Sequence, residues 1–194
     1  MEKQRITWDE GTWTHQPVAV DLKGDTMVVT AQEGSDAWRN TSYGFVHDTE
    51  HALVKELPIG AAMEVTFMAS FDQQFDQAGI FVRLNEYTWV KAGVEYADGE
   101  LQLGAVVTHD NSDWSVAPVP GWSDSEVCIR ISRHDDCLII RARKVGEDFA
   151  LVRVTPFSGS NGVMAGPFTC APTRAGLQVR FTQWYLTEAD KSLH

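Results

Sequence analysis

The stretch that decides the fold is Gln77-Ala-Gly-Ile-Phe-Val-Arg-Leu-Asn-Glu-Tyr-Thr-Trp-Val-Lys-Ala-Gly-Val-Glu-Tyr-Ala-Asp-Gly-Glu-Leu-Gln-Leu-Gly-Ala-Val-Val-Thr108, because its two turns fix how its segments pair. Asp98-Gly99 is a strong two-residue hairpin signal. A three-residue loop at 85–87 keeps one face of the first hairpin apolar, whereas a two-residue loop would mix Ile80 with Lys91 on that face. The stretch therefore predicts three antiparallel strands in a defined register.

This register gives the three strands one apolar face and one mixed face. The apolar face is expected to carry Ala78, Ile80, Val82, Val90, Ala92, Val94, Leu101, Leu103, Ala105 and Val107. The mixed face is expected to carry four cross-strand rows, which are Gln77-Glu95-Gln102, Gly79-Gly93-Gly104, Phe81-Lys91-Val106 and Arg83-Trp89-Thr108. One buried and one solvated face are typical of a sheet in an antiparallel two-layer sandwich.

A row of three glycines crosses the middle of the mixed face. Glycine weakens a strand interior, so three abreast indicate a place where something approaches the sheet closely. A ligand is one interpretation; the other is that the glycines accommodate a loop aromatic or ease the bend of a curved sheet. Both interpretations make this the concave face, and Gly93→Val is expected to block ligand access while the fold survives.

The rest of the chain alternates short β-branched and aromatic runs with turn signals and shows no sustained helical period. Strands are expected at residues 18–22, 27–30, 63–70, 78–84, 88–96, 101–108, 127–133, 138–144, 150–155 and 177–182. No linker or internal repeat divides the chain, so residues 1–194 are predicted to form a single all-β domain, a two-sheet antiparallel jelly-roll sandwich. Residues 187–194 are expected to be a solvated tail.

Charge and cysteine content narrow the classes of partner and compartment. The formal net charge is −11, so the long-range field repels polyanions, and nucleic acid is not an expected partner. Neither an apolar leader nor a stretch long enough to span a membrane is recognisable, so no membrane association and a cytoplasmic location are expected. The three cysteines, Cys128, Cys137 and Cys170, have no metal or disulfide spacing and are predicted to be free thiols.

Two polar clusters resemble metal sites in composition only. His47, Asp48 and His51 lack the helical context of a metal site and are interpreted as loop residues. Asp110-Asn111-Ser112-Asp113 is interpreted as a turn capped by its own side chains rather than as a calcium loop. Glycine-rich phosphate loops are absent from the sequence, and no cofactor or metal is expected.

Several longer motifs carry a resemblance. They are Asp36-Ala-Trp-Arg-Asn-Thr-Ser-Tyr-Gly-Phe45, His47-Asp48, His51, Asp76-Gln-Ala-Gly-Ile-Phe-Val-Arg83, Trp89-Val-Lys-Ala-Gly-Val-Glu-Tyr96, Val106-Val-Thr108, Ser112-Asp-Trp-Ser115, Gly166-Pro167 and Ala171-Pro172. With these motifs nearly the whole chain resembles the concanavalin A-like family of proteins of unknown function that includes the fungal regulation-of-enolase proteins. The resemblance implies a jelly-roll sandwich of the lectin and glucanase type, but it implies no established activity.

The mixed face, with its neighbouring loops, predicts a binding site for a carbohydrate or small polar ligand. The candidate ligand-binding residues are Tyr43, His51, Gln77, Arg83, Trp89, Lys91, Glu95, Gln102, Thr108 and Trp114. Glycoside hydrolysis needs two carboxyl groups, and Glu95 stands alone on its strand, so that alternative requires a loop acid such as Asp48, Asp72, Asp76 or Asp113. A protein-interaction module in metabolic regulation is a third hypothesis. The sequence leaves the catalytic residues, if any, and the oligomeric state undefined.

Overall fold

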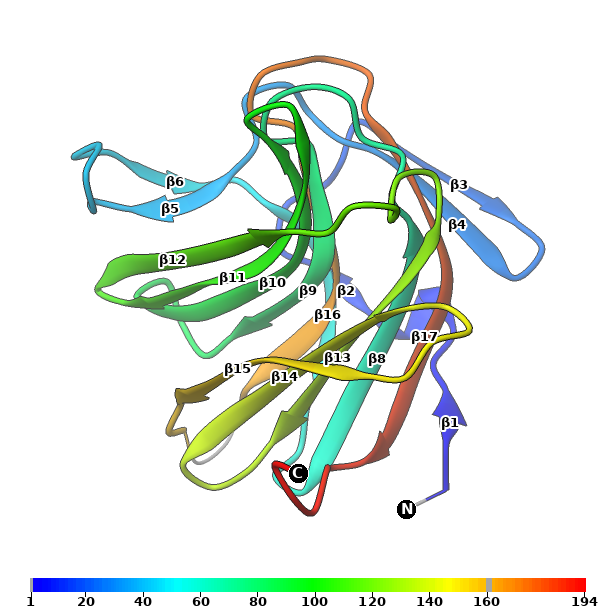
Figure 1. Ribbon diagram of the computed structural model, residues 1–194, viewed down its shortest axis with the longest axis vertical. Helices are drawn as coiled ribbons and strands as arrows, with labels where there is room; N and C mark the ends of the chain where they lie inside the picture. The colour runs from blue at the N-terminus through cyan, green and yellow to red at the C-terminus, as the bar shows by residue number, and fades with distance from the viewer. Residues whose placement is uncertain (1, 160–161) are drawn as a thin grey trace.

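The computed structural model describes residues 2–159 and 162–194, and its elements form an antiparallel β-sandwich (Figure 1). One sheet has the strand order β15-β14-β13-β8-β17-β4-β3, with β1 also paired to β17. Its strands are β1 (Gln4–Arg5), β3 (Ala19–Lys23), β4 (Thr26–Thr30), β8 (Ala61–Met68), β13 (Glu126–Arg133), β14 (Cys137–Lys144), β15 (Ala150–Pro156) and β17 (Gln178–Glu188). The all-β two-sheet prediction is confirmed.

The second sheet has the order β12-β11-β10-β9-β16-β7-β2. Its strands are β2 (Thr12–Trp13), β7 (His51–Glu56), β9 (Gln77–Arg83), β10 (Thr88–Ala97), β11 (Glu100–His109), β12 (Asn111–Pro118) and β16 (Met164–Cys170). A separate hairpin, β5 (Ala37–Arg39) with β6 (Val46–Asp48), projects beside β12 in Figure 1. The remaining element is a short 3-10 turn, η1 (Trp8–Glu10).

The predicted register of the central meander is confirmed at every row. Gly93 pairs with Gly79 and Gly104, and Glu95 pairs with Gln77 and Gln102. The Asp98-Gly99 turn forms with φ angles of 55° and 88°, the positive pair that a type I′ hairpin requires. The apolar face of the meander packs into the core between the sheets, which buries Ile80, Ala92 and Val94 against the other sheet.

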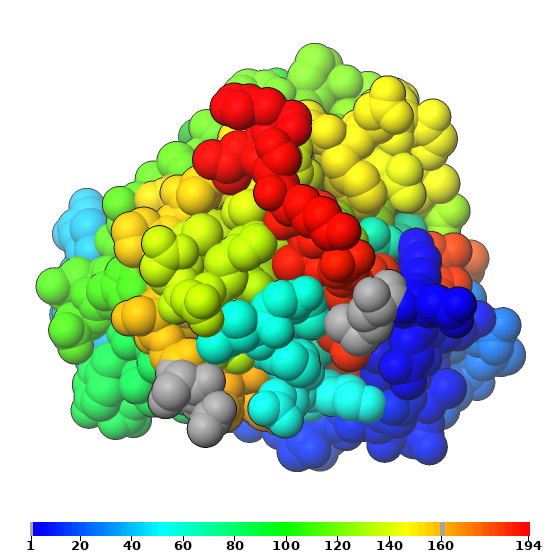
Figure 2. Space-filling model, turned by 90° about the horizontal axis from the view of Figure 1, so that it is seen from below, coloured from blue at the N-terminus to red at the C-terminus, as the bar shows by residue number. Residues whose placement is uncertain are grey.

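The structure contains strands that the sequence analysis did not predict, which are β1, β2, β5, β6, β7 and β16, so His47, Asp48 and His51 lie in strands and not in a loop. Two further segments also differ from the sequence prediction. Residues 111–113 belong to strand β12 and not to an extended turn, because Asp110 alone, at φ 62°, reverses the chain between β11 and β12. The C-terminal residues are not a solvated tail either. The carboxylate of Asp190 accepts 3.0 Å bonds from Arg130 Nε and Arg141 Nε, and Figure 2 shows this segment lying across the surface of the molecule.

The cysteines agree with the sequence prediction. Cys128, Cys137 and Cys170 are free, and burial raises the pKa of each thiol, most strongly that of Cys170. Among the described residues, the structure contains no helix long and apolar enough to cross a membrane.

Candidate functional site

The face of the seven-stranded sheet that looks away from the sandwich core contains a cavity of about 350 Å³. Its floor comes from the central meander, with Gln77, Lys91, Glu95 and Val106. Its walls come from the β5–β6 hairpin, from Trp114 on β12 and from three loops, which are β4–β5, β8–β9 and β16–β17. Besides Trp114, the wall residues are Gly34, Asp36, Trp38, Tyr43, Phe45, His47, Phe75, Pro172 and Thr173. The cavity therefore lies between one curved sheet and one projecting hairpin.

One wall of the cavity is a chain of aromatic rings. Trp38 meets Tyr43 and Trp114 edge to face, with ring centroids 5.7 and 6.3 Å apart, and Tyr43 stacks on Phe45 at 5.1 Å. Phe45 in turn meets the ring of His47 at 4.6 Å. Tyr43 and Phe45 are 57% and 41% exposed, which is unusual for neighbouring large rings. Exposed stacked rings are suited to contact with an apolar ligand surface.

Hydrogen bonds to strand β12 hold the hairpin in place over the sheet. The backbone N–H of Arg39 donates to Ser112 Oγ at 2.9 Å, and Arg39 Nε donates to the carbonyl oxygen of Asp110 at 3.1 Å. At the base of the hairpin, the backbone N–H of Asp36 donates to Thr49 Oγ1, and the N–H of Thr49 donates to the carbonyl of Asp36. These bonds fix the aromatic wall relative to the floor.

Lys91 is the cation of the cavity floor, and its side chain is almost fully buried. Its Nζ donates to Asp36 Oδ1 at 2.7 Å and to Gln77 Oε1 at 2.9 Å. Burial by itself lowers the pKa of Lys91, but the charges of Asp36, Cys170 and Glu95 and the Asp36 bond outweigh burial, and the pKa is raised overall. The ammonium is therefore charged and held by groups of the floor.

Glu95 is the second charged group of the floor. Its Oε1 accepts a 2.9 Å hydrogen bond from the indole Nε1–H of Trp114. Burial raises the pKa of Glu95, while Lys91 and the indole bond oppose that rise and Asp36 adds to it. The other carboxylate oxygen of Glu95 is a hydrogen-bond acceptor for a ligand, and the neighbouring rings provide an apolar surface beside it.

The glycine row results from the close approach of neighbouring strands. A Cβ at Gly93 would lie 2.0 Å from the carbonyl oxygen of Ala78, and one at Gly79 would lie 2.0 Å from that of Ala92. A Cβ at Gly104 would lie 1.9 Å from the carbonyl oxygen of Ser115. The expectation that Gly93→Val would leave the fold intact is thus corrected, since a side chain there collides with the next strand.

Only a hollow of about 20 Å³ lies over the glycines, between Glu95, Trp114 and Phe168. Such a volume holds about one water molecule. Because Trp114 stands in the row beyond the glycines and bonds back to Glu95, its indole crosses over the glycine row. Of the two interpretations of the glycines, the structure therefore supports the one in which they allow a bent sheet and accommodate an aromatic side chain.

Five of the ten candidate residues lie together in the cavity, and they are Tyr43, Gln77, Lys91, Glu95 and Trp114. The other five lie outside it. Trp89 is buried and stacks on Phe81 at 5.4 Å, so its ring packs in a second apolar cluster beneath the hairpin. Arg83 faces Asp48 and Glu50 at the far end of its strand.

The side chains of the remaining three candidates are buried and form hydrogen bonds within the chain. Gln102 donates from Nε2 to the carbonyl oxygen of Ala97 and braces the adjacent turn. Thr108 Oγ1 lies 2.8 Å from Ser112 Oγ, behind the anchor of the hairpin. His51 accepts the backbone N–H of Gln32 at Nε2, so its Nδ1 carries the proton and donates to the carbonyl of His15, and burial lowers its pKa. Both ring nitrogens of His51 are therefore used within the chain.

Asp36, Phe45 and Phe75 line the cavity but were not among the site residues predicted from the sequence. Asp36 and Phe45 lie in the motif Asp36-Ala-Trp-Arg-Asn-Thr-Ser-Tyr-Gly-Phe45, so the motif itself was the available signal. Phe75 has a φ of 67°, a conformation rare for a bulky residue, and no sequence pattern marks it. Its placement depends on the loop that precedes β9.

The four loop acids proposed as partners of Glu95 are placed elsewhere. The carboxylate of Asp76 is fully buried and accepts bonds from Arg174, which also pairs with Asp72 at 3.3 Å. Asp113 pairs with Arg153 at 2.9 Å, and Asp48 faces Arg83. Instead, Asp36 is the second carboxylate that lines the cavity with Glu95.

Comparison with known proteins places this geometry in a family. The family described as "Protein of unknown function (DUF1349)" matches residues 13–189. The chain belongs to this family. Regulation of enolase protein 1 of Saccharomyces cerevisiae is 35% identical over 195 residues, which span 100% of this chain and 98% of the yeast protein. Uncharacterized protein AN7484 of Emericella nidulans is 31% identical over 151 residues, 72% of this chain and 76% of that protein.

Solved structures show the same sandwich among DUF1349 proteins and beyond. A functionally unknown protein from Saccharomyces cerevisiae superposes with a TM-score of 0.89 at 34% identity, over 95% of this chain and 100% of that one. Xylan β-1,4-xylosidase from Bacillus halodurans superposes with a TM-score of 0.72 at 14% identity, over 97% of this chain but only 40% of the xylosidase. This second likeness concerns the fold alone.

Proposed function

We propose that this DUF1349 protein binds a carbohydrate or a similar small polar ligand in the cavity between the β5–β6 hairpin and the central meander. The observation that carries the proposal is the pairing of an exposed aromatic wall, built around Tyr43 and Phe45, with a polar floor of buried Gln77 and Lys91 and half-buried Glu95.

A sugar presents an apolar C–H face and a rim of hydroxyl groups, and the cavity offers a partner for each. The stacked rings of Tyr43 and Phe45 match the apolar face. Glu95 supplies a carboxylate acceptor for hydroxyl groups, and Asp36 supplies a second one at the cavity edge. The volume of about 350 Å³ falls at the small end of the usual range for ligand sites, which favours a short ligand over a long chain.

The choice of first probes follows from the structural neighbours. One neighbour is the xylan β-1,4-xylosidase, and another is the "CBM2 module" of a Lactobacillus casei phage protein, which superposes with a TM-score of 0.63 at 8% identity. Because these likenesses concern the fold alone, a broad panel is needed in which xylo-oligosaccharides are one class among several.

The test is calorimetric titration of a panel of short oligosaccharides and sugar phosphates into wild-type protein and three variants. Tyr43→Ala and Phe45→Ala remove exposed rings of the wall at little cost to the core. Tyr87→Ala removes a ring of similar exposure that lies outside the cavity and is the matched control. The proposal expects a saturable ligand whose affinity falls at least tenfold in the first two variants and is unchanged in the control; equal affinity in all four proteins would refute it.

A second candidate function is glycoside hydrolysis, and one observation favours it. Asp36 and Glu95 line the same cavity, and their environments differ, because Lys91 neutralises Asp36 directly whereas burial raises the pKa of Glu95. A carboxyl group with a raised pKa near a second carboxyl group in a different environment is the combination that glycosidases use. The assay is release of reducing sugar: turnover that is lost in both Asp36→Asn and Glu95→Gln supports hydrolysis, and binding without turnover supports the binding protein.

A further inference from the structure

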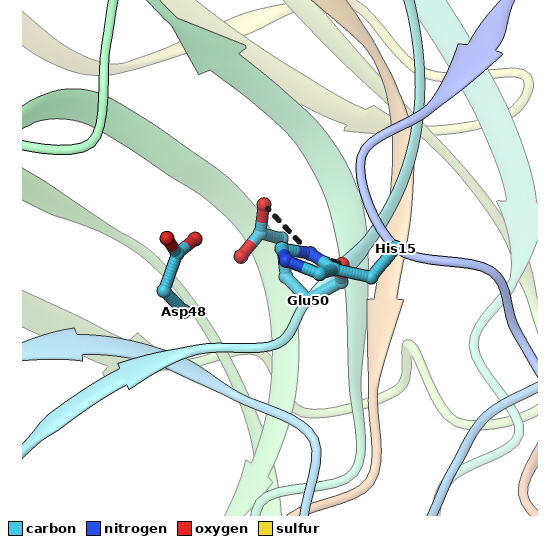
Figure 3. Close-up of side chains that lie close together, drawn as sticks. All are labelled: His15, Asp48 and Glu50. Carbon is cyan, nitrogen blue, oxygen red and sulfur yellow. Dashed lines mark hydrogen bonds and ion pairs between the residues drawn. The ribbon is translucent and has the colours of Figure 1, made fainter.

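A second polar cluster lies at the turn between β6 and β7, away from the cavity floor. His15, Asp48 and Glu50 each offer one ligand atom, and these atoms all lie within 4.8 Å of one another. Figure 3 shows the Glu50 carboxylate beside the imidazole ring of His15, with the Asp48 carboxylate to one side. Asp48 and Glu50 come from one segment of the chain, and His15 comes from a distant one. None of these three side chains lines the aromatic-walled cavity, so the cluster has no role in the proposed ligand site.

Glu50 is the unusual member of this cluster. Its side chain is fully buried, and neither of its carboxylate oxygens has a hydrogen-bond partner in the described part of the chain. Burial, with a further contribution from the charge of Asp48, raises the pKa of Glu50 to about 7. A buried carboxylate without a hydrogen bond is costly, and buried charges in proteins are normally paired or coordinate a metal.

Two nearby basic side chains, His15 and Arg83, do not satisfy this carboxylate. His15 Nδ1 lies 3.7 Å from Glu50 Oε1, and Arg83 lies 4.0 Å from the same oxygen and 3.6 Å from Asp48 Oδ1. These separations exceed hydrogen-bonding distance. The cluster therefore holds two acidic groups around a centre to which neither His15 Nδ1 nor Arg83 donates a hydrogen bond.

The backbone around the cluster is held rigidly. Thr14 N donates to the carbonyl oxygen of Ala52, and Thr14 Oγ1 donates to that of Glu50. His15 Nδ1 lies 2.9 Å from the same Glu50 carbonyl oxygen. In the tautomer that donates this bond, Nε2 keeps its lone pair, which is the arrangement found in metal-ligating histidines, whose other N–H is held by a carbonyl or carboxylate.

We propose that His15, Asp48 and Glu50 form a binding site for a divalent transition-metal ion of the zinc class. One imidazole nitrogen with two carboxylate oxygens suits Zn²⁺ better than Ca²⁺ or Mg²⁺, which take oxygen ligands almost exclusively. Three protein ligands leave a fourth position for water or another ligand. Asp48, with a side chain 42% exposed, gives the ion a route from solvent to the buried Glu50.

Metal binding would draw the cluster together. Zinc bonds of about 2.0–2.2 Å place the ligand atoms of a tetrahedral site roughly 3.3–3.5 Å apart, so the side chains rotate inward from their present spacing. Arg83 is positively charged, as the metal ion is, and it competes with the ion for the carboxylates of Asp48 and Glu50. Removal of the Arg83 charge is therefore expected to strengthen metal binding.

The test is calorimetric titration of Zn²⁺ into the chelator-treated full-length chain, with circular dichroism of every variant as the check on folding. Wild type is expected to bind one equivalent, and His15→Gln, Asp48→Asn and Glu50→Gln are expected to bind at least tenfold more weakly. His109→Gln, which alters an exposed histidine outside both the cluster and the cavity, is the control and is expected to bind as wild type does. Arg83→Gln is expected to bind more tightly.

Asp48→Asn keeps the test decisive even if Glu50→Gln fails to fold, because Asp48 is exposed. Absence of saturable zinc binding in wild type, or equal affinity in His15→Gln and wild type, overturns the proposal. Calcium binding of similar strength at the same site would contradict the assignment to the transition-metal class. None of these readouts depends on the carbohydrate proposal.

Discussion

The indole Nε1–H of Trp114 donates a 2.9 Å hydrogen bond to Glu95 Oε1 and so links edge strand β12 to β10 across β11. The two residues lie in different cross-strand rows, with Gly93 and Gly104 in the row between them. The indole can cross that row because Gly93 and Gly104 have no side chain there. This contact positions the Glu95 carboxylate against the Trp114 ring of the aromatic wall.

The first prediction concerns the charge state of Glu95. The indole bond stabilises the ionised carboxylate and opposes the effect of burial, so Trp114→Phe is expected to raise the pKa of Glu95 further. Titration of the side-chain carboxyl carbon by NMR measures this pKa directly. Trp122→Phe removes a tryptophan outside the cavity and should leave it unchanged. An unchanged pKa in Trp114→Phe would mean that the indole bond does not form in solution.

The second prediction concerns stability and pH. Because the folded-state pKa of Glu95 lies above its ordinary value of 4.5, folded protein holds this proton more tightly than unfolded chain does. Ionisation of Glu95 therefore costs stability as the pH rises from 4.5 through the folded-state pKa. Glu95→Gln removes that cost. The free energy of unfolding of Glu95→Gln, measured by urea denaturation, should therefore increase relative to that of wild type as the pH rises across this window. Glu100→Gln makes the same charge change at an exposed site and controls for net charge; identical curves for the two variants would contradict the prediction.

The third prediction concerns the glycine row. Gly93→Ala would bring a Cβ to 2.0 Å from the Ala78 carbonyl oxygen, and strands β9 and β10 would have to separate. We expect a loss of about 3 kcal/mol or more in the free energy of unfolding. Gly24→Ala, at an open turn with φ 59°, is expected to cost only about 1 kcal/mol. Comparable losses in both variants would show that the neighbouring strand yields easily at Gly93.

The meander was predictable in detail because its turns and its alternation of apolar and polar residues both require the same strand register. Asp98-Gly99 allows one hairpin geometry, and a one-residue slip would turn Ile80 and Ala92 out of the core. Strand β12 was not predictable in the same way, since residues 111–113 are polar and a single residue, Asp110, makes its turn. The C-terminal segment was mispredicted because its anchors, Arg130 and Arg141, are distant in sequence.

The candidate site was predictable only where strand register defines it. Gln77, Lys91 and Glu95 follow from the meander and reach the cavity. Register says which face a side chain is on but not what covers that face, so it could not show that Trp89 is buried within a second apolar cluster. Equally, the fold of the β5–β6 hairpin brings Asp36 to Lys91 across 55 positions of sequence, and no local pattern encodes that contact.

The most direct measurement for the central claim is the two-dimensional NMR signal of the tryptophan indole N–H groups during titration with an oligosaccharide that binds. The chain contains seven tryptophans, and Trp114→Phe identifies the signal of interest by its disappearance. Binding in the cavity predicts a saturable shift of the Trp114 signal, with the signal of Trp184, buried in the core between the sheets, unmoved. Saturable binding that leaves the Trp114 signal in place would contradict the proposed site.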